Sequence, residues 1–452
     1  MTLRMVMTNA IVLRIIQGLS LGLYLYIYPM TLLDAFGGYD PDPAHESSAL
    51  FLVAVVFAFG IMLEAMLELP LGAYGDIRGY KPTLALSFLF RTIYFIGFIP
   101  LIFFKGEVTF ASLIAFATIA LFSISYTCWS GTNSAWFYES VKSVGAEEKY
   151  EKLLSKVLIF YYSAFIAGSI ISAWVYFEFK QQIGDKYIFD KGEYIIYSLG
   201  AIICLLGTIY SRFIISEPRK FEPRAYITEL GVVLSEAYKY CLKVKNIFLL
   251  IQLSAFFTLL IYVTDYLWPI YAKDILNIKS FNIKWLSIVV VMTFSNLLGN
   301  IIIVRIPARP NENESASQWR RLLLACMAYG LPIAILSLLA IFIGDGRDGF
   351  LLFLFLVAIG KIAEGGKEAP FDALLNRSIS HAKIENAKRS PEETRATILS
   401  AATIFNALVV LLFFVPTTVL TTVLGQKNTV QGWIIPSALL MIFVLLTRKR
   451  LK

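Results

Sequence analysis

The sequence predicts an all-α membrane protein in which twelve transmembrane helices form two bundles of six, with both termini in the cytoplasm. Three observations predict this fold: twelve long apolar stretches, a bias of positive charge toward alternate loops, and one long polar stretch near the middle of the chain. The composition agrees, because 58% of the 452 residues are hydrophobic, 16% are charged and the mean hydropathy is +0.69. Soluble domains carry about 25% charged residues.

Each apolar stretch is long enough to cross a bilayer, whose hydrocarbon core of about 30 Å needs roughly 20 residues of helix. The strands of a membrane barrel would alternate in hydrophobicity over about ten residues, and the sequence does not show that alternation. The expected helices occupy residues 9–33, 48–73, 82–104, 109–136, 153–177, 193–214, 246–272, 284–305, 320–343, 349–373, 397–424 and 430–447.

The loop charges set the expected orientation. With the N-terminus inside, 28 of the 40 Lys and Arg residues, Arg14 among them, fall on the cytoplasmic side, nine on the outer side and three within helices. The net charge of +8 therefore indicates membrane topology rather than nucleic-acid binding. No cleavable leader is expected at the N-terminus. The long polar stretch divides the chain into a bundle over 1–214, a linker over 215–245 and a bundle over 246–452.

The loop after the second expected helix has the sequence GAYGDIRGYK. Gly72 allows two helices to approach closely, and Gly79 permits a tight turn. Asp76 is an anion that can bind the N-terminus of a helix across the interface between the bundles. Arg78 and Lys81 can pair with acidic groups or with lipid phosphates.

Three further segments occur in order along the chain: ELPLG at 68–72, SGTNSAWFYES at 130–140 and RATILS at 395–400. Together with the GAYGDIRGYK loop, they resemble the major facilitator superfamily and, within it, a branch of bacterial drug and metabolite exporters. The resemblance implies two bundles that rock around a central site. It also implies a gate latch made of Gly72, Asp76, Arg78, Gly79, Lys81 and Arg395.

The second of these segments supplies two candidate substrate contacts, Asn133 and Trp136. The chain also departs from the drug/proton antiporters of the superfamily. It has no arginine within 109–136 and no proline after Gly168, and Ile77 stands where the loop motif has an arginine. These departures concern the proton-antiport mechanism and leave the fold prediction unchanged.

The tenth expected helix carries charges that are costly inside a membrane and therefore point to a cavity or a partner. Lys361, Glu364, Lys367 and Glu368 recur at helical spacing and share one face. We expect Lys361 and Glu364 to contact substrate, and Glu364 to carry a coupling proton. The alternative is a structural ladder of ion pairs.

The second and third expected helices add Glu64, Glu68 and Arg91 at comparable depth. A pair between Arg91 and one of the two glutamates is the simplest way to accommodate all three charges. That pair favours a structural role, while a buried carboxylate is also a candidate proton carrier. We therefore include all three residues among the proton-coupling candidates.

Tyr24 in the first helix and Tyr262 and Asp265 in the seventh are further candidate substrate contacts. An acidic and aromatic wall suits a cationic or amphipathic organic molecule through cation–π and apolar contact. Aromatic residues near helix ends are also ordinary anchors at the membrane interface.

The sequence offers no sign of catalysis. His45 and His381 are the two histidines, and neither has a metal-ligand neighbour at the next turn. No Walker loop is present, and the four cysteines lack CxxC spacing. We therefore expect no enzyme activity, no metal and no cofactor.

Taken together, the sequence predicts a secondary active transporter in the plasma (inner) membrane, acting as a monomer among membrane lipids. It would export a drug-like compound or a metabolite in exchange for protons. A flippase for lipids or lysolipids and an importer of nutrients remain alternatives on the same fold. A sensor or structural protein without flux is the alternative from another class, and it predicts a centre plugged by ion pairs.

Overall fold

The computed structural model is all-helical, as the sequence predicts, and no strand occurs in the ranges that it describes. These are residues 2–25, 27–36, 43–104, 107–178, 191–218, 226–274, 283–307, 309, 312–339, 347–384, 387–424, 440, 442 and 444. The elements are α1 (Leu3–Tyr24), α2 (Tyr28–Ala35), α3 (Pro43–Arg78), α4 (Tyr80–Phe103), α5 (Val108–Ser143), η1 (Glu147–Lys149), α6 (Tyr150–Glu178), α7 (Lys191–Phe213), α8 (Tyr226–Lys243), α9 (Lys245–Asp274), α10 (Ile283–Arg305), α11 (Glu314–Leu339), α12 (Arg347–Ser380) and α13 (Arg395–Leu424).

The apolar helices confirm a multi-pass membrane protein. Seven helices in the described ranges are long and apolar enough to cross a membrane, and α8 with α9, bent by 88°, would make an eighth. The expected number of twelve is not confirmed. The last expected helix, 430–447, lies almost entirely outside the described residues. Helix α12 stands at the tenth expected position, but its charged side chains between Lys361 and Glu368 reduce its apolar character.

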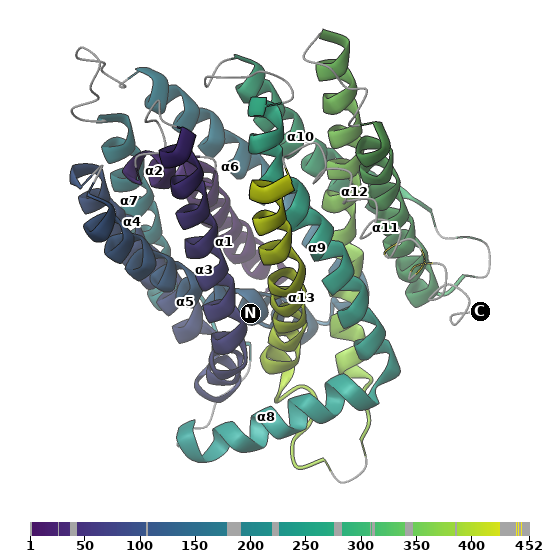
Figure 1. Cartoon of the computed structure of the whole chain (residues 1–452). Coiled ribbons are helices and arrows are strands. Elements are labelled where there is room, and N and C mark those ends of the chain that lie inside the picture. Colours follow the sequence, from purple (N-terminus) through teal and green to yellow (C-terminus); the bar gives the residue numbers. More distant parts are fainter. Residues whose placement is uncertain are drawn as a thin grey trace.

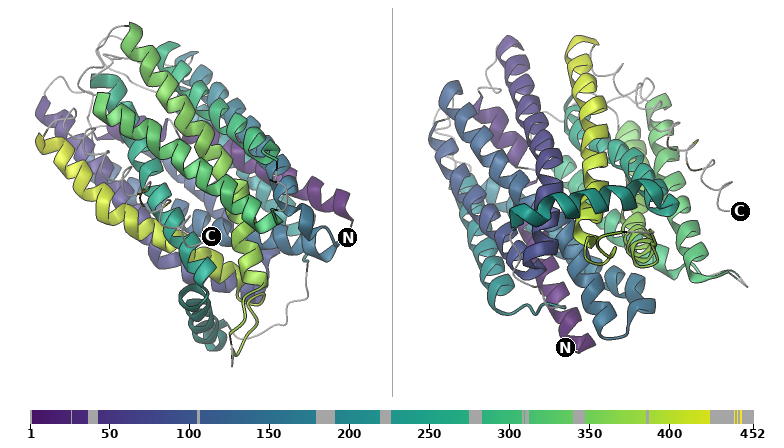
Figure 2. Two further views of the ribbon diagram at one scale, coloured as in Figure 1. Left: turned by 90° about the vertical axis from the view of Figure 1, so that its right-hand side faces the viewer. Right: turned by 90° about the horizontal axis from the view of Figure 1, so that it is seen from below.

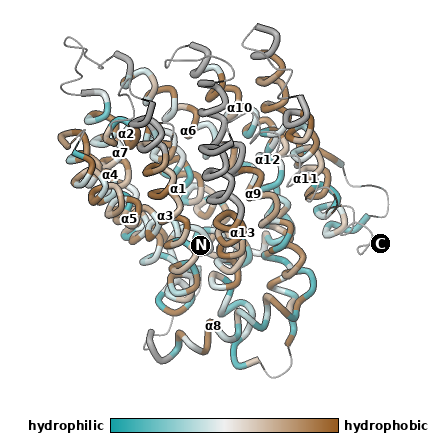
Figure 3. Tube along the Cα trace, viewed as in Figure 1, coloured by the Kyte–Doolittle hydropathy of each residue, from teal (hydrophilic) through white to brown (hydrophobic). Residues whose placement is uncertain are grey.

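The helices form two groups (Figure 1). Helices α1–α7 lie on one side of the molecule and α9–α13 on the other. Across the boundary α3 packs along α13, and α6 packs along α10. One hydrophobic cluster includes Val6 and Trp136 from the first group and Leu250 and Ala396 from the second. Figure 3 shows apolar residues along the helices and hydrophilic residues gathered at the end near α8.

The first expected helix is broken into two. Helix α1 ends at Tyr24, and α2 begins at Tyr28 with Pro29 in its first turn. Proline lacks a backbone N–H, so it fits the first turn of a helix, where that N–H has no partner within the helix. The proline therefore explains why the chain restarts a helix at this point.

The polar linker contains a helix that the sequence analysis did not specify. Helix α8 lies across one end of the molecule, beneath both groups (Figures 1 and 2). Its Val233 is buried against Ala73 and Ile77 of α3. Its Glu229 forms an ion pair with Arg389, which precedes α13. Helix α8 therefore contacts both groups at this end.

Glycines allow α10 and α12 to cross with their backbones in contact. A Cβ atom added at Gly365 would lie 1.9 Å from the carbonyl oxygen of Asn296, and one at Gly299 would lie 1.7 Å from that of Ile362. Membrane helices use small residues in this way because close backbone packing replaces the hydrophobic driving force available in water. This crossing fixes the position of the charged face of α12.

We predict that Gly365→Ala separates α10 from α12 and lowers the free energy of unfolding by about 1–3 kcal/mol, the usual cost of overpacking. Thermal unfolding of the detergent-solubilised protein measures the loss. Gly360→Ala on the same helix is the matched control, because its Cβ would meet nothing closer than 3.8 Å. Equal stability of the two variants would contradict the tight crossing.

Candidate functional site

The two helix groups are joined at the α8 end by a carboxylate bound to a helix N-terminus. Asp76 near the end of α3 is buried, and its two oxygens accept the backbone N–H groups of Ala396 at 3.1 Å and Thr397 at 2.8 Å. The Thr397 hydroxyl donates a third hydrogen bond at 2.8 Å. These N–H groups belong to the first turn of α13, where they have no partner within the helix and where the helix dipole attracts an anion.

Arg395, the first residue of α13, extends this junction to two more helices. Its side chain is fully buried, and its Nε donates to Glu139 of α5 at 2.8 Å. Its other nitrogens donate to the carbonyl and side-chain oxygens of Asn376 and to the Ser380 hydroxyl, both on α12. The guanidinium also lies 4.4 Å from the centre of the Tyr138 ring. Arg395 therefore holds α5, α12 and α13 together.

Asp372 of α12 is a second carboxylate at the boundary, and the sequence analysis missed it. It accepts hydrogen bonds from Ser134 of α5 and Tyr150 of α6, both in the opposite group. Asn376, one turn further on, donates to the Asp372 carboxylate and to Ser134. A signal was present in the sequence, since Asp372 continues the helix face of Lys361, Glu364 and Glu368 by one more turn.

The other gate candidates lie around these contacts. A Cβ added at Gly72 would lie 2.6 Å from the Ser400 hydroxyl of α13, so the glycine permits α3 and α13 to meet. Gly79 has a φ of 111° at the turn between α3 and α4, which favours glycine. Arg78 is exposed, and the backbone N–H of Lys81 donates to Glu217 at 2.7 Å.

The charges of α12 separate into different environments. Lys361 and Glu364 form an ion pair at 2.6 Å, with side-chain exposures of 5% and 16%. The Lys367 ammonium lies 4.3 Å from the centre of the Phe257 ring of α9, within its own group. Glu368 accepts the hydroxyl of Tyr162 of α6 at 2.8 Å, across the boundary.

The expected pair between Arg91 and a glutamate is not formed. Arg91 of α4 is fully buried and donates to Ser125 of α5 at 3.1 Å and to Ser20 of α1 at 3.4 Å. Glu68 of α3 instead accepts the Ser130 hydroxyl of α5 at 2.9 and 2.8 Å. Glu64 is buried and has no hydrogen bond or ion pair with any residue that the structure describes. Arg91 faces α1 and α5 from α4, whereas Glu68 faces α5 from the boundary side, which explains the difference.

Two of the remaining substrate candidates are packed inside the protein. Tyr24 is buried among aromatic rings that include Tyr94 and Phe122, at centre-to-centre distances of 5.5 and 5.3 Å. Trp136 is fully buried, and its indole N–H donates to the carbonyl of Ser216 at 3.1 Å. The side chains of Tyr262 and Asp265 lie outside the described residues.

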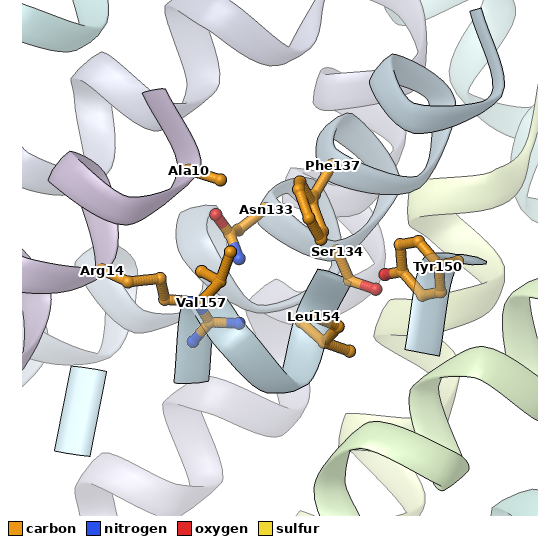
Figure 4. Close-up of a pocket in the computed structure, with 8 residues that line it drawn as sticks. All are labelled: Ala10, Arg14, Asn133, Ser134, Phe137, Tyr150, Leu154 and Val157. Atoms are coloured by element: carbon orange, nitrogen blue, oxygen red, sulfur yellow. The ribbon is translucent and has the colours of Figure 1, made fainter. Parts of the chain in front are cut away.

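Asn133 is the substrate candidate that lines a pocket (Figure 4). The pocket lies between α1, α5 and α6, next to the contacts of Ser134 and Tyr150 with Asp372. These contacts close the boundary between the two groups at the α8 end, which we call the closed end. Arg14, which the charge count had assigned to the cytoplasmic side, reaches into it from the middle of α1. The lining residues are Ala10, Arg14, Asn133, Ser134, Phe137, Tyr150, Leu154 and Val157.

Comparison with known proteins gives a family match and several similar folds. The family model described as Major Facilitator Superfamily matches residues 10–414. The human organic anion transporter MFSD10 (TETRAN) is 13% identical with a TM-score of 0.63, and the alignment covers 98% of this chain and 99% of that one. A bacterial homologue of the iron transporter ferroportin in the outward-facing state is 12% identical with a TM-score of 0.65, covering 98% and 97%.

The xylose transporter XylE from E. coli, in a partially occluded inward open conformation, is also 12% identical, with a TM-score of 0.64 and coverage of 98% and 97%. No curated protein sequence matches the chain. At such low identities these structures establish a shared fold and leave the substrate open.

We predict that Asp76→Asn weakens the closed end by about 1–2 kcal/mol, because it removes the charge that the α13 N-terminus attracts. The closed population should then fall about five- to thirtyfold relative to the open one. Spin labels at Glu148→Cys and Lys388→Cys, both exposed and in opposite groups, report the change as a longer distance in pulsed electron resonance.

Arg78→Gln is the matched control for this experiment, because it removes an exposed charge two residues from Asp76. The distance distribution should stay unchanged in that variant. The same unchanged distribution in Asp76→Asn would show that the carboxylate does not hold the two groups together.

Proposed function

The chain belongs to the major facilitator superfamily, and from this premise we propose that it is a secondary active transporter for a small organic molecule. It would move its substrate by alternating access, as two six-helix bundles over 1–214 and 246–452, joined by the linker 215–245, rock against each other. The exported species would be a drug-like compound or a metabolite, and protons would drive its export.

The single observation that carries this proposal is the way the boundary between the helix groups closes. Asp76, Arg395 and Asp372 bind across it through hydrogen bonds, and a pocket that contains Asn133 lies directly behind them. Water can replace such polar contacts when the boundary opens, so breaking them costs far less than exposing an apolar core. A closed end with a polar pocket behind it is what alternating access requires.

The loop charges indicate which side is closed. The loops at this end include those around Arg78, Lys149 and Arg389, and the positive-inside rule assigns them to the cytoplasm. The structure would then represent an outward-facing state of a protein in the plasma (inner) membrane, with both termini inside. We expect it to work as a monomer, because each step of this scheme uses groups of a single chain.

Proton coupling is assigned to acidic groups near the boundary. Glu364 is partly exposed and forms an ion pair with Lys361 at 2.6 Å, so water can reach it, and we assign the coupling proton to this carboxylate first. Glu68 would respond to opening, because its partner Ser130 lies on the segment that contacts α13. Glu64 and Arg91 are further members of this charged set within the α1–α7 group.

The other functions on the same fold give different outcomes in one assay. A lysolipid flippase would move a fluorescent lysolipid between leaflets, and a nutrient importer would accumulate sugars or amino acids. A sensor or structural protein would move neither these nor any drug-like compound. Everted membrane vesicles with an imposed pH gradient distinguish these cases, because coupled substrates collapse the gradient.

We predict that Glu364→Gln abolishes the collapse of the pH gradient by compounds that collapse it in wild-type vesicles, while the protein remains folded. The amide keeps the size of the side chain but cannot release a proton. A fluorescent pH dye inside the vesicles provides the measurement.

Glu314→Gln is the control, because Glu314 is a more exposed carboxylate that pairs with Arg377. It should retain the wild-type response. Wild-type rates with Glu364→Gln would remove this residue from the coupling mechanism, and a wild-type protein inert to drugs, lysolipids and nutrients would overturn the proposed transport function.

A further inference from the structure

The Arg14 side chain forms no ion pair with any residue that the structure describes, and neutral groups hold its guanidinium in place. Its guanidinium lies 5.5 Å from the centre of the Trp129 ring and 5.7 Å from that of Tyr161, so two aromatic faces position it. One nitrogen donates to the side-chain oxygen of Gln17 at 3.0 Å. A guanidinium has five N–H donors. In the described part of the chain no carboxylate forms an ion pair with Arg14, so donors remain available on the pocket side.

Asn133 faces the same space. Asn133 is 5% exposed, and its side-chain amide has no hydrogen bond with any residue in the described ranges. Figure 4 shows the Asn133 amide and the Arg14 guanidinium reaching into the pocket from α5 and α1. An amide that borders a pocket and has no protein partner can bind water or a polar group from outside the chain.

The acidic groups near this pocket already have donors of their own. Asp372 accepts the hydroxyls of Ser134 and Tyr150, and Glu368 accepts that of Tyr162. Asp372 is near enough to interact electrostatically with Arg14, but among the described residues it forms no ion pair with the guanidinium. An incoming anion would meet a cation with free donors, whereas an incoming cation would have to take a carboxylate from its present partners.

We propose that Arg14 and Asn133 form a binding subsite for an anionic group of the substrate: a carboxylate, phosphate or sulfonate. The planar guanidinium matches two oxygens of such a group, and the Asn133 amide supplies a further donor. Phe137, Leu154 and Val157 also line the pocket, whose free volume of about 10 Å³ holds about one water molecule in this state. An apolar body attached to the anionic group would therefore enter only after the boundary opens. The proposal rests on the proposed transport function and narrows its substrate to organic anions.

Binding of small charged probes tests this subsite. Benzoate, phenyl phosphate and benzenesulfonate share their ring with benzylammonium and benzyl alcohol and differ from them in charge. Thermal unfolding of the purified protein, at constant ionic strength, measures the stabilisation that each probe confers. We expect at least one of the anions to stabilise the wild-type protein in a concentration-dependent way, and the cation and the alcohol to have no such effect.

Variants assign the effect to the pocket. Arg14→Gln should weaken the apparent affinity at least about tenfold, the usual value of a charged hydrogen bond. Arg14→Lys should weaken it less, because it keeps the charge and loses the planar fork. Asn133→Ala should weaken it as well. Arg4→Gln removes an exposed charge from the same helix and should leave the affinity unchanged.

Three results would overturn the subsite: no stabilisation by any of the three anions, equal stabilisation by benzylammonium, or an anion affinity that neither Arg14 variant changes. If Arg14→Gln does not give monodisperse protein, the anion affinity of Arg14→Lys decides whether Arg14 belongs to the subsite. The outcome is separate from that of the transport assay. If the vesicles respond to cations alone, the transport function stands and the subsite is overturned. If anions bind but no compound changes the pH gradient of the vesicles, the subsite stands and the transport function is overturned.

Discussion

The structure depends on one electrostatic constraint, the burial of the Asp76 carboxylate at the N-terminus of α13. A buried carboxylate without partners is strongly unfavourable, and this one is satisfied by two backbone N–H groups and one hydroxyl from the opposite helix group. Helices α3 and α13 must therefore meet in one register or separate far enough for water to reach Asp76. Intermediate positions would leave the charge buried and unpaired, so the constraint favours two discrete states.

The contacts next to Asp76 extend the requirement for one fixed register from α3 and α13 to α5 and α12. Arg395 is next to the N–H groups that bind Asp76, and it fixes α5 and α12 to the same point. Gly72 and Gly131 bring the backbones close enough for these short side chains to reach, because any Cβ there would collide with α13. The contacts of Asp76 and Arg395 are polar and short. They can therefore fix the relative position of the helices without making the closed arrangement excessively stable.

The membrane helices and the Asp76 loop could be predicted from the sequence, whereas the partners of the buried charges could not. Apolar runs of spanning length predict membrane helices, and the resemblance of the loop around Asp76 to the family motif implies a gate residue. Depth along a helix can be estimated from sequence, but the direction of a side chain around the helix cannot. For that reason Arg91 was expected beside a glutamate and instead faces Ser20 and Ser125.

Arg14 shows the second source of error. The sequence predicts a helix that begins at residue 9 and places Arg14 near its end, whereas α1 begins at Leu3 and Arg14 lies halfway along it. The six additional residues place Arg14 at the middle of the helix, where the energy of its charge depends on its partners. Lys361 forms an ion pair with Glu364 at 2.6 Å, whereas the direct contacts of the Arg14 guanidinium with described residues are a neutral amide oxygen and two rings.

This contrast places the proposed subsite in relation to the latch. Ser134 lines the pocket and also donates to Asp372 across the boundary. An anion held by Arg14 would therefore sit next to a hydroxyl that closes the boundary, and it could compete with Asp372 for that donor. A ligand shifts a two-state equilibrium only if it interacts differently with the two states. A hydroxyl shared between the pocket and the closed boundary provides such a difference.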